Sequence, residues 1–481
     1  MGSLGRRDDA LERLRRDDFD LLVVGGGIVG AGVALEASLH GLRCALVEGA
    51  DFASGASSRS SKLVHGGFRY LATGDVDVVR ESLAERAFLV RNAPTLVRPL
   101  AQRIPIEPIA DIADGFAHLL ETYTQLAGER TSLPPHRRRR DAFEYYEAVT
   151  EDFRLTLAVL RAAAARGATV VNHVRLVGLE SGSDAVRAEL RDELARERFT
   201  ATARGVVLAV GARIGELARK LGRADDAPVR PSRGTHVVLR LDGRRLPTAI
   251  ATRHPDDGRP IFVLPWKGHV LLGTTDTPCG REGPAEAPAT RQDVAYLLDG
   301  IRPVLPDGCE PAAAWTGVRC LYADRDGGST VDLSRGDRLL ELAPRVVAVT
   351  GGKLTTFRPV ARRALRLAVA SCGLEAAPRP ARFPQLRETL PAAGRGDDEL
   401  LPGLELGRAA LRAAARDELA ATLDDVLTQR LGISLVAPAD AAARAPAWAD
   451  EVGDVLGWSA AKRERQVSDY VRGLDRFRLP A

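Results

Sequence analysis

The chain has few cysteines and no long uninterrupted apolar run. Its 481 residues include five cysteines, none in a C-x-x-C pair, so the sequence predicts no metal site and no disulfide framework. Scattered thiols of this kind indicate a reducing compartment. The most apolar stretch, 21–39, contains five glycines and Glu36, which argues against a membrane span. The first 18 residues lack the apolar stretch of a signal peptide. We therefore expect a cytoplasmic protein, either free or bound at the cytoplasmic face of the membrane.

Lysine is also scarce, although the chain is rich in basic residues. The 68 Lys and Arg residues exceed the 64 acidic ones by four. No basic stripe with interleaved aromatic residues is present, which argues against a nucleic-acid partner. Because nearly all the cations are arginine, each retained lysine indicates a position where a compact, titratable charge is needed. The lysines are Lys62, Lys220, Lys267, Lys353 and Lys462.

The chain does contain enough apolar sequence for two or three structural units. Its composition, 45% apolar and 27% charged, is typical of a soluble globular protein. We predict a strand–helix–strand unit first, then strands of an antiparallel sheet, a late strand and helix, a Pro- and Gly-rich linker, and a helical C-terminal part. The predicted helices are 28–40, 75–92, 152–166 (with Asp152 as N-cap), 355–370, 408–432, 447–456 and 459–474. The predicted strands are 19–24, 43–48, 169–174, 205–210, 235–241, 260–266, 270–275 and 345–349.

A glycine turn follows the first predicted strand. Residues 25–30 read G-G-G-I-V-G, which fits the G-x-G-x-x-G pattern between a strand and a helix. Gly25 permits the tight turn, Gly27 lets a pyrophosphate approach the backbone, and Gly30 lets the helix pack closely on the strand. Glu48, at the end of the next strand, can accept hydrogen bonds from ribose hydroxyls. A glycine run can also be a simple turn, but in this context it predicts dinucleotide binding without separating FAD from NAD.

Two further motifs carry polar and cationic groups. Residues 54–71 read S-G-A-S-S-R-S-S-K-L-V-H-G-G-F-R-Y-L, and residues 350–357 read T-G-G-K-L-T-T-F. The first is either a flexible hydroxyl-rich loop or the place where the reactive end of a cofactor lies. The second is a capped helix start whose N-terminal dipole would stabilise an anionic reduced flavin.

These three motifs resemble those of the FAD-dependent (aerobic, respiratory) glycerol-3-phosphate dehydrogenases, within the D-amino-acid-oxidase-like flavoprotein superfamily. Further matches run in register: G-E-R-T-S-L-P at 128–134, S-R-G-T-H at 232–236, G-T-T-D at 273–276 and T-G-V-R at 316–319. Residues 422–427, T-L-D-D-V-L, resemble the C-terminal helical domain of that family. The resemblance covers nearly the whole chain.

The resemblance implies a fold of the α/β class with an α+β substrate part. A Rossmann-like FAD-binding domain would be interleaved with an antiparallel-sheet substrate domain, and an all-helical C-terminal domain would follow. The oxidoreductase domain would span 19–375, with FAD-binding segments at about 19–75, 150–220 and 340–375 and substrate-binding segments at about 76–149 and 221–339. The linker would be 376–407 and the helical domain 408–481.

The resemblance also implies FAD as the cofactor and assigns residues to it. Its nucleotide part would be held by Gly25, Gly27, Ile28, Gly30, Glu48, Val174 and Gly211. The isoalloxazine or pyrophosphate would lie near Ser57, Ser58, Lys62, Leu63 and His65. The pyrimidine end would be covered by Gly352, Lys353, Leu354 and Thr355.

The implied reaction is oxidation of sn-glycerol 3-phosphate to dihydroxyacetone phosphate, with the C2 hydride passing to flavin N5. Guanidinium and ammonium groups suit a phosphate dianion, and the residues matching the family's substrate site are Arg69, Tyr70, Thr275, Arg319, Arg335 and Lys353. The catalytic candidates are His65, Arg69, Arg319 and Lys353. His65 would be either the base for the C2 hydroxyl, since an imidazole titrates near neutrality, or a hydrogen-bond partner of the flavin that moves no proton. Lys353 or Arg319 would stabilise the developing alkoxide.

The sequence departs from the family pattern at a few positions. The segment A-V-G-A-R at 209–213 ends in Arg213 where tryptophan is usual, and Cys320 stands where proline is usual. The basic run 136–140 is a solvated loop or a segment attracted to anionic lipid. The expected electron acceptor is a quinone, at a peripheral membrane contact, and a homodimer is compatible with the sequence. The alternatives are an oxidase using oxygen, a relative oxidising a 2-hydroxy acid or amino acid, and a flavin-binding scaffold without turnover.

Overall fold

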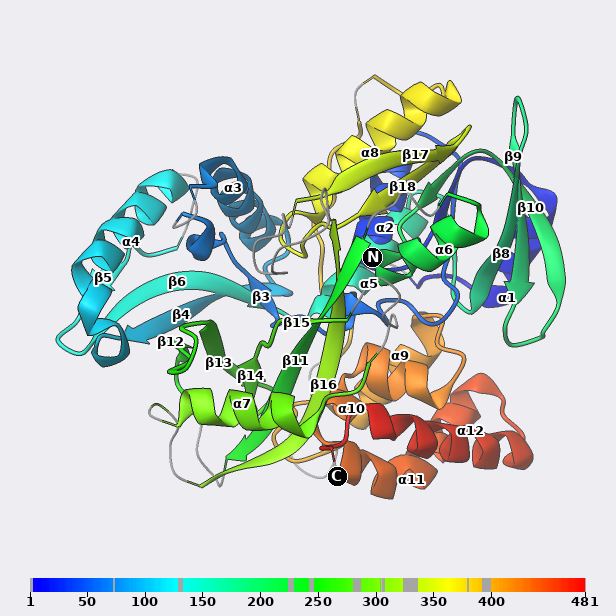
Figure 1. Cartoon of the computed structure of the whole chain (residues 1–481). Coiled ribbons are helices and arrows are strands. Elements are labelled where there is room, and N and C mark those ends of the chain that lie inside the picture. Colours follow the sequence, from blue (N-terminus) through cyan, green and yellow to red (C-terminus); the bar gives the residue numbers. More distant parts are fainter. Residues whose placement is uncertain are drawn as a thin grey trace.

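A computed structural model describes residues 3–71, 74–128, 133–223, 229–241, 246–279, 287–302, 304, 308–322, 336–378, 380–391 and 399–480. Two large sheets and a C-terminal group of helices build the chain (Figure 1). Among the helices of these residues, none combines the length and apolar character needed to cross a bilayer.

The first sheet has eight strands and a parallel centre. Its order is β17-β18-β10-β1-β2-β7, and the five strands from β18 to β7 are mutually parallel. The antiparallel pair β8–β9 joins this sheet along β10. The strands are β1 (Asp18–Val24), β2 (Cys44–Val47), β7 (Thr169–Val171), β8 (Val174–Ser181), β9 (Val186–Asp192), β10 (Arg198–Leu208), β17 (Arg338–Ala343) and β18 (Val346–Thr350).

Both faces of this parallel centre are covered, which explains why β2 and β18 are buried along their whole length and, apart from Thr350, apolar. One face packs against helices α2 (Ile28–Leu39), α5 (Asp152–Ala164) and α8 (Phe357–Cys372). The other face packs against α1 (Arg7–Arg16), α6 (Ile214–Lys220) and the β8–β9 pair. Strand β9 alternates buried and exposed residues because only one of its faces meets this core.

The second sheet has ten strands and is antiparallel except where β4 pairs with β12. Helices α3 (Val76–Asn92) and α4 (Ala113–Ala127) cover β4 and β6, and α7 (Arg291–Ile301) covers β11, β13 and β14 (Figure 1). The strands are β3 (Leu63–Val64), β4 (Val97–Pro105), β5 (Arg137–Arg138), β6 (Ala142–Thr150), β11 (Val229–Leu241), β12 (Ala249–Arg253), β13 (Pro260–Trp266), β14 (His269–Gly273), β15 (Thr277–Pro278) and β16 (Cys309–Tyr322).

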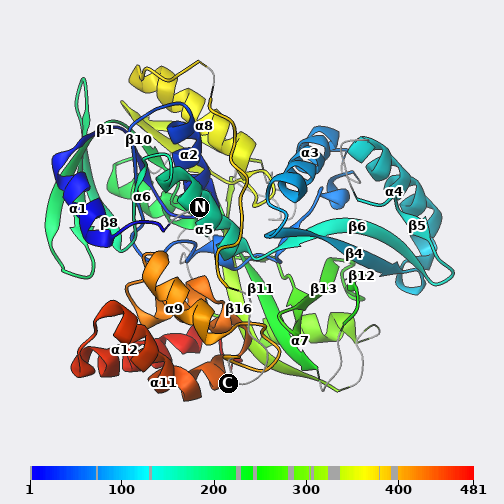
Figure 2. The ribbon, with the colours of Figure 1, turned by 180° about the vertical axis from the view of Figure 1, so that it is seen from behind.

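The C-terminal helices form a separate lobe, on the opposite side of the molecule from α3 and α4 (Figures 1 and 2). They are α9 (Arg408–Asp417), the π-helical turn Asp425–Arg430, α10 (Ile433–Val436), α11 (Pro438–Leu456) and α12 (Ala460–Gly473). Their core is continuous with Trp266 and Trp315 of the second sheet. The lobe therefore packs directly on the antiparallel sheet, which was predicted to belong to the substrate-binding domain.

Several element predictions were wrong in their bounds. The helix expected at 447–456 begins at Pro438, and the strands expected at 205–210 and 235–241 begin at Arg198 and Val229. The single helix expected at 408–432 ends at Asp417, because Glu418 turns inward to buried arginines and Leu419 adopts a φ of +53°. The late helix begins at Phe357, two residues after its predicted start. Asp152 lies inside the first turn of α5 and Glu151 is the N-cap, since the Asp152 carboxylate faces a buried lysine.

The predicted linker is bonded to the body of the protein. Backbone N–H groups of Ala377, Ala381 and Leu386 donate to carbonyls of His40, Leu39 and Asn92. Residues 380–391 therefore run along the surface of the parallel-sheet unit.

Candidate functional site

The motifs predicted to carry the chemistry follow the carboxyl ends of strands in the parallel sheet. The glycine turn follows β1, Glu48 follows β2, Gly211 follows β10, and the second glycine turn follows β18. In open α/β sheets, ligands bind outside the carboxyl ends of the strands. Four separate segments of the sequence are thus brought to the edge where such a ligand lies.

The first glycine turn has no room for side chains. Gly25 has a φ of +113°, and a Cβ atom there would overlap the carbonyl oxygen of Ala209. A Cβ atom at Gly30 would overlap the carbonyl oxygen of Gly25. The turn is therefore held between β10 and the first turn of α2, as the dinucleotide pattern requires.

The N-terminus of α2 already donates to an oxygen acceptor. The Ile28 N–H donates to the Ser57 hydroxyl over 2.9 Å, and a Cβ atom at Gly27 would lie 3.1 Å from the same oxygen. A side chain at residue 27 would thus fill the space between the helix and the serine loop. A pyrophosphate oxygen is an acceptor that this N–H and the helix dipole fit.

Glu48 is fixed by the backbone around it. Its two carboxylate oxygens accept hydrogen bonds from the N–H groups of Gly26 (2.7 Å) and Ala50 (2.8 Å). The Val174 N–H donates to the Glu48 carbonyl oxygen, which places Val174 beside this acid. A carboxylate oxygen accepts more than one hydrogen bond, so Glu48 can also receive ribose hydroxyls.

The serine loop places Lys62 away from the surface. The Lys62 ammonium is fully buried and donates to Asp152 (2.7 Å) and to the Ser58 carbonyl oxygen (2.5 Å). Ser58 is also fully buried. Leu63 is buried in β3, which pairs with β6. Of the predicted contacts in this loop, Ser57 reaches α2, whereas the Lys62 ammonium is committed to an internal ion pair.

His65 has a defined proton arrangement. The Gly67 N–H donates to His65 Nδ1 over 3.0 Å, so Nδ1 is unprotonated and the neutral ring carries its proton on Nε2. Gly66 is anchored by its own N–H, which donates to the buried Glu147 carboxylate (3.1 Å). Glu147 also pairs with buried Arg86. The backbone around His65 is therefore held by the β6 side of the second sheet.

The second glycine turn meets the end of the serine loop. The Lys353 ammonium lies 3.9 Å from the centre of the Tyr70 ring, a cation–π contact. Gly351 and Gly352 have φ values of +71° and +88°, and a Cβ atom at Gly352 would lie 3.6 Å from Val29 at the start of α2. Leu354 is partly buried against the α2–α5–α8 core, and Thr355 is buried.

Arg319 and Thr275 form a second group from the antiparallel sheet. The Arg319 guanidinium donates to the Thr275 carbonyl oxygen (3.3 Å) and the Thr274 hydroxyl (3.0 Å) and lies 3.6 Å from Asp276. The Thr275 hydroxyl accepts from the Thr235 N–H. The backbone of Arg69 lies in the short helix Phe68–Tyr70.

Three contacts bring these groups to one region. Burial raises the pKa of the Cys320 thiol, next to Arg319, to about 11, and the nearby Gly351 backbone opposes this rise. A Cβ atom at Gly317 would lie 2.7 Å from the Arg59 carbonyl oxygen. With the Tyr70–Lys353 contact, the serine loop, strand β16 and the second glycine turn therefore form one continuous wall. Arg335 lies outside the described residues.

His236 was not among the residues predicted for the site, and the structure places it beside the serine loop. Its Nε2 lies 2.9 Å from the Ser61 hydroxyl, and its ring stacks on Trp315 with 4.5 Å between ring centres. Burial, followed by the charges of Arg319 and Lys62, holds the pKa of His236 well below its usual range, so the ring is neutral. The S-R-G-T-H match at 232–236 was the sequence signal for this histidine, but it did not indicate which side chain the histidine contacts.

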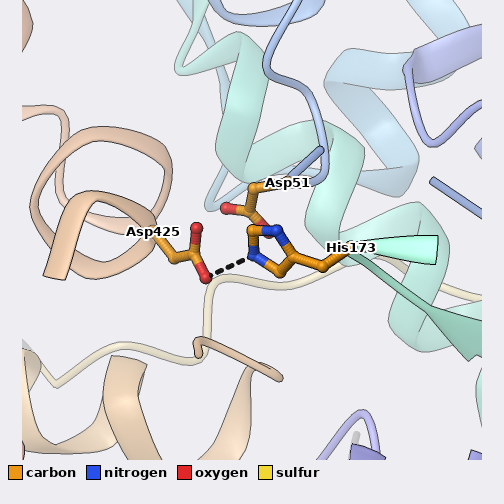
Figure 3. A group of neighbouring side chains, drawn as sticks. All are labelled: Asp51, His173 and Asp425. Carbon is orange, nitrogen blue, oxygen red and sulfur yellow. Dashed lines mark hydrogen bonds and ion pairs between the residues drawn. The ribbon is translucent and has the colours of Figure 1, made fainter. Parts of the chain in front are cut away.

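A second cluster joins the C-terminal lobe to the nucleotide edge (Figure 3). Ligand atoms of Asp51, His173 and Asp425 all lie within 4.8 Å of one another. His173 Nε2 donates to Asp425 over 2.9 Å, and Arg430 pairs with Asp51 at 2.5 Å. Burial lowers the pKa of His173, but Asp425 outweighs it and raises the pKa to about 9. A protonated imidazole has no lone pair for a metal ion, and His173, Arg430 and Arg7 supply cations to this cluster.

The fold and the site together define a dinucleotide-dependent oxidoreductase. Residues 20–363 match the FAD dependent oxidoreductase family, and residues 382–463 match the C-terminal domain of alpha-glycerophosphate oxidase. The cofactor is therefore FAD, as predicted.

Individual relatives narrow this class. The chain is 33% identical to glycerol-3-phosphate dehydrogenase 2 of Mycobacterium bovis, over 97% of this chain and 90% of that protein. It is also 33% identical to the aerobic glycerol-3-phosphate dehydrogenase of Staphylococcus haemolyticus, over 74% of this chain and 68% of that protein. The chain belongs to the FAD-dependent glycerol-3-phosphate dehydrogenase family. A solved structure of glycerol-3-phosphate dehydrogenase from Bacillus halodurans with FAD shares the fold, with a TM-score of 0.73 and 23% identity. The match covers 99% of this chain and 98% of that one. The predicted family and fold class are confirmed.

Proposed function

We propose that this chain oxidises sn-glycerol 3-phosphate to dihydroxyacetone phosphate. The proposal is carried by the meeting of Lys353, Tyr70 and the Arg319 strand at the wall that continues from the dinucleotide edge. Bound FAD supplies the hydride acceptor at this wall. The names of the curated relatives support the same substrate.

The domain division and site residues predicted from the sequence are part of this proposal. FAD would be held along the carboxyl edge, with Gly25, Gly27, Ile28 and Ser57 as the residues nearest its pyrophosphate. Lys353 and Arg319 provide cationic groups for the phosphate dianion and for the alkoxide that develops at C2. Arg69 and Arg335 complete the substrate set.

His65 acts in this proposal as a hydrogen-bond donor from Nε2. Because Nδ1 accepts the Gly67 N–H, a neutral His65 has no free lone pair at Nε2 with which to remove the C2 hydroxyl proton. We therefore expect His65→Gln to lower kcat by about a hundredfold or more while the limbs of the kcat/KM pH profile remain. Disappearance of the limb near neutrality would instead assign the base to His65.

The decisive experiment is an anaerobic visible spectrum before and after adding sn-glycerol 3-phosphate. A flavin spectrum that bleaches within the mixing time, with dihydroxyacetone phosphate formed in equal amount, supports the proposal. A spectrum that bleaches only with a 2-hydroxy acid or an amino acid would replace the substrate. No bleaching by any of them would favour a flavin-binding scaffold.

The electron acceptor is a separate part of the proposal. We propose a quinone at the cytoplasmic face of the membrane, where the exposed Arg137–Arg138 strand and the arginines after it would meet anionic lipid. Co-sedimentation with anionic but not neutral vesicles, and faster reoxidation by a soluble quinone than by oxygen, would support it. The second candidate is an oxidase, which the match of residues 382–463 favours. Stoichiometric hydrogen peroxide would select that candidate.

A further inference from the structure

Lys62 is the most deeply enclosed charge of the serine loop. Its ammonium has no exposed surface and its backbone adopts a φ of +59°. It donates to one oxygen of Asp152 and to the Ser58 carbonyl oxygen. The other Asp152 oxygen accepts from both the N–H (3.0 Å) and the hydroxyl (2.7 Å) of Ser60. The carboxylate at the start of α5 therefore holds Ser60 and Lys62 directly, and it holds Ser58 through the Lys62 ammonium.

Three aromatic rings enclose the same ammonium. Its Nζ lies 5.1 Å from the ring centres of Trp266 and Trp315 and 5.6 Å from that of Phe153. We call Phe153, Trp266 and Trp315 the aromatic box. An ammonium is a compact charge, whereas a guanidinium is wide and planar, so the box explains the lysine here in a chain whose basic residues are mostly arginine.

The C-terminal lobe forms the outer wall of the aromatic box. The Trp315 indole N–H donates to the carbonyl oxygen of Leu435 in α10 over 3.2 Å. A Cβ atom at Gly432 would lie 2.8 Å from the Phe153 ring. All three rings belong to the core cluster that the lobe helices build. The position of Lys62 thus depends on the lobe as well as on Asp152.

The Lys62–Asp152 pair lies between two functional ends of the loop. Ser57, just before it, bonds to the N-terminus of α2, and His65, just after it, is held by the Gly67 N–H. A shift of the pair would move both ends. The pair can therefore affect the cofactor indirectly, although its charged atoms are buried among protein groups.

We infer that Lys62 and Asp152 are positioning residues, which hold the serine loop against FAD through the aromatic box and so couple the C-terminal lobe to the flavin. The inference rests on the proposed binding of FAD along this loop. Its rival is direct contact between the Lys62 ammonium and FAD.

The test uses full-length Lys62→Met, Asp152→Asn and the double variant, with Lys220→Met as the matched control. Lys220 is an exposed lysine paired with Glu216. The readouts are the FAD dissociation constant after reconstitution, the flavin midpoint potential, and kcat and KM separately.

Each single variant leaves one buried charge without its partner, so FAD binding should weaken by about tenfold or more. The double variant removes both charges and should bind FAD more tightly than either single one. The midpoint potential should shift in both single variants, and kcat should fall more than KM rises, because neither residue contacts the substrate. The control should match the wild type.

Two results would overturn the inference. If Asp152→Asn binds FAD like the wild type while Lys62→Met and the double variant lose it equally, Lys62 contacts the cofactor directly. If all three variants retain wild-type affinity and potential, the pair is only a core ion pair. Should Lys62→Met fail to fold, Asp152→Asn and the double variant still separate these results. Affinity and potential need no substrate, so failure of wild type to react with sn-glycerol 3-phosphate would sink the proposed function alone.

Discussion

His173 should make the attachment of the C-terminal lobe dependent on pH. The ring of this residue bridges the loop after β7 and the π-helical turn of the lobe, 2.9 Å from Asp425 (Figure 3). The pKa of His173 is set by burial, which lowers it, and by the charges of Asp425 and Asp51, which raise it more; Arg7 opposes them. The net result is about 9, against an ordinary value of 6.5.

This difference converts to a stability contribution. A gap of about 2.5 between the folded and unfolded pKa corresponds to about 3 kcal/mol. Because the folded pKa is the higher one, the contribution is fully present below pH 6.5 and is lost as pH rises towards 9. The pKa of Asp425 is lowered, since the charge of His173 and its hydrogen bond outweigh the effect of burial, so this carboxylate stays ionised throughout.

The perturbation is His173→Asn, which removes the titration and suits the φ of +54° at this position. Hydrogen exchange of the amides in 421–431 should report local opening, and comparing variant with wild type at matched pH cancels the intrinsic rates. At about pH 6 the free energy of local opening should be about 3 kcal/mol lower in the variant than in the wild type. Above about pH 9.5 this difference should vanish. A difference that stays constant across this range would refute the reasoning, because the bridge would then not depend on the His173 proton.

Three further outcomes follow from single contacts. Gly30→Ala places a methyl group on the Gly25 carbonyl oxygen and should abolish FAD retention, measured as the flavin-to-protein absorbance ratio. The control is Gly41→Ala, whose Cβ atom would have no neighbour within 4 Å. It should lower the free energy of unfolding by only about 1 kcal/mol and keep FAD. Lys353→Met removes the cation over Tyr70 and should raise the KM for sn-glycerol 3-phosphate by about tenfold or more, with rates normalised to bound flavin because Lys353 is also a predicted FAD contact; an unaltered KM would remove Lys353 from the phosphate set. Glu418→Gln leaves Arg154 and Arg161 without their shared buried carboxylate and should destabilise the lobe by about 3 kcal/mol or more in urea unfolding, while Glu464→Gln, on α12, serves as the control.

The nucleotide edge was predictable because its determinants are local. Gly25 needs a positive φ and Gly30 needs contact without a side chain, and both requirements are visible as glycines at fixed spacing. The helix predicted at 28–40 is Ile28–Leu39 in the structure. The strand endings that bring Glu48 and Gly352 to the same edge follow from parallel pairing, once the strands are recognised.

Lys62 shows where this reasoning stops. Its position in a loop beside the nucleotide unit favoured a cofactor contact, but its partner, Asp152, is 90 residues further along the chain. Spacing within the sequence carries no information on such a pair. The break after α9 has the same origin, because Glu418 leaves the helix to meet Arg154 and Arg161 of α5. Long-range pairing of buried charges, rather than helix propensity, decides both local structures.

The C-terminal lobe carries none of the glycine motifs of the nucleotide edge, yet its buried attachments end beside the predicted FAD contacts. Arg430 pairs with Asp51, three residues after Glu48, and Asp425 bonds to His173, the neighbour of Val174. The aromatic box, walled by α10, encloses Lys62. Removing the lobe would leave Asp51 without its arginine and would open the box, so the buried charges that remain would destabilise the loops that carry the predicted cofactor contacts. The lobe is therefore better understood as the support of the flavin site than as an appended module.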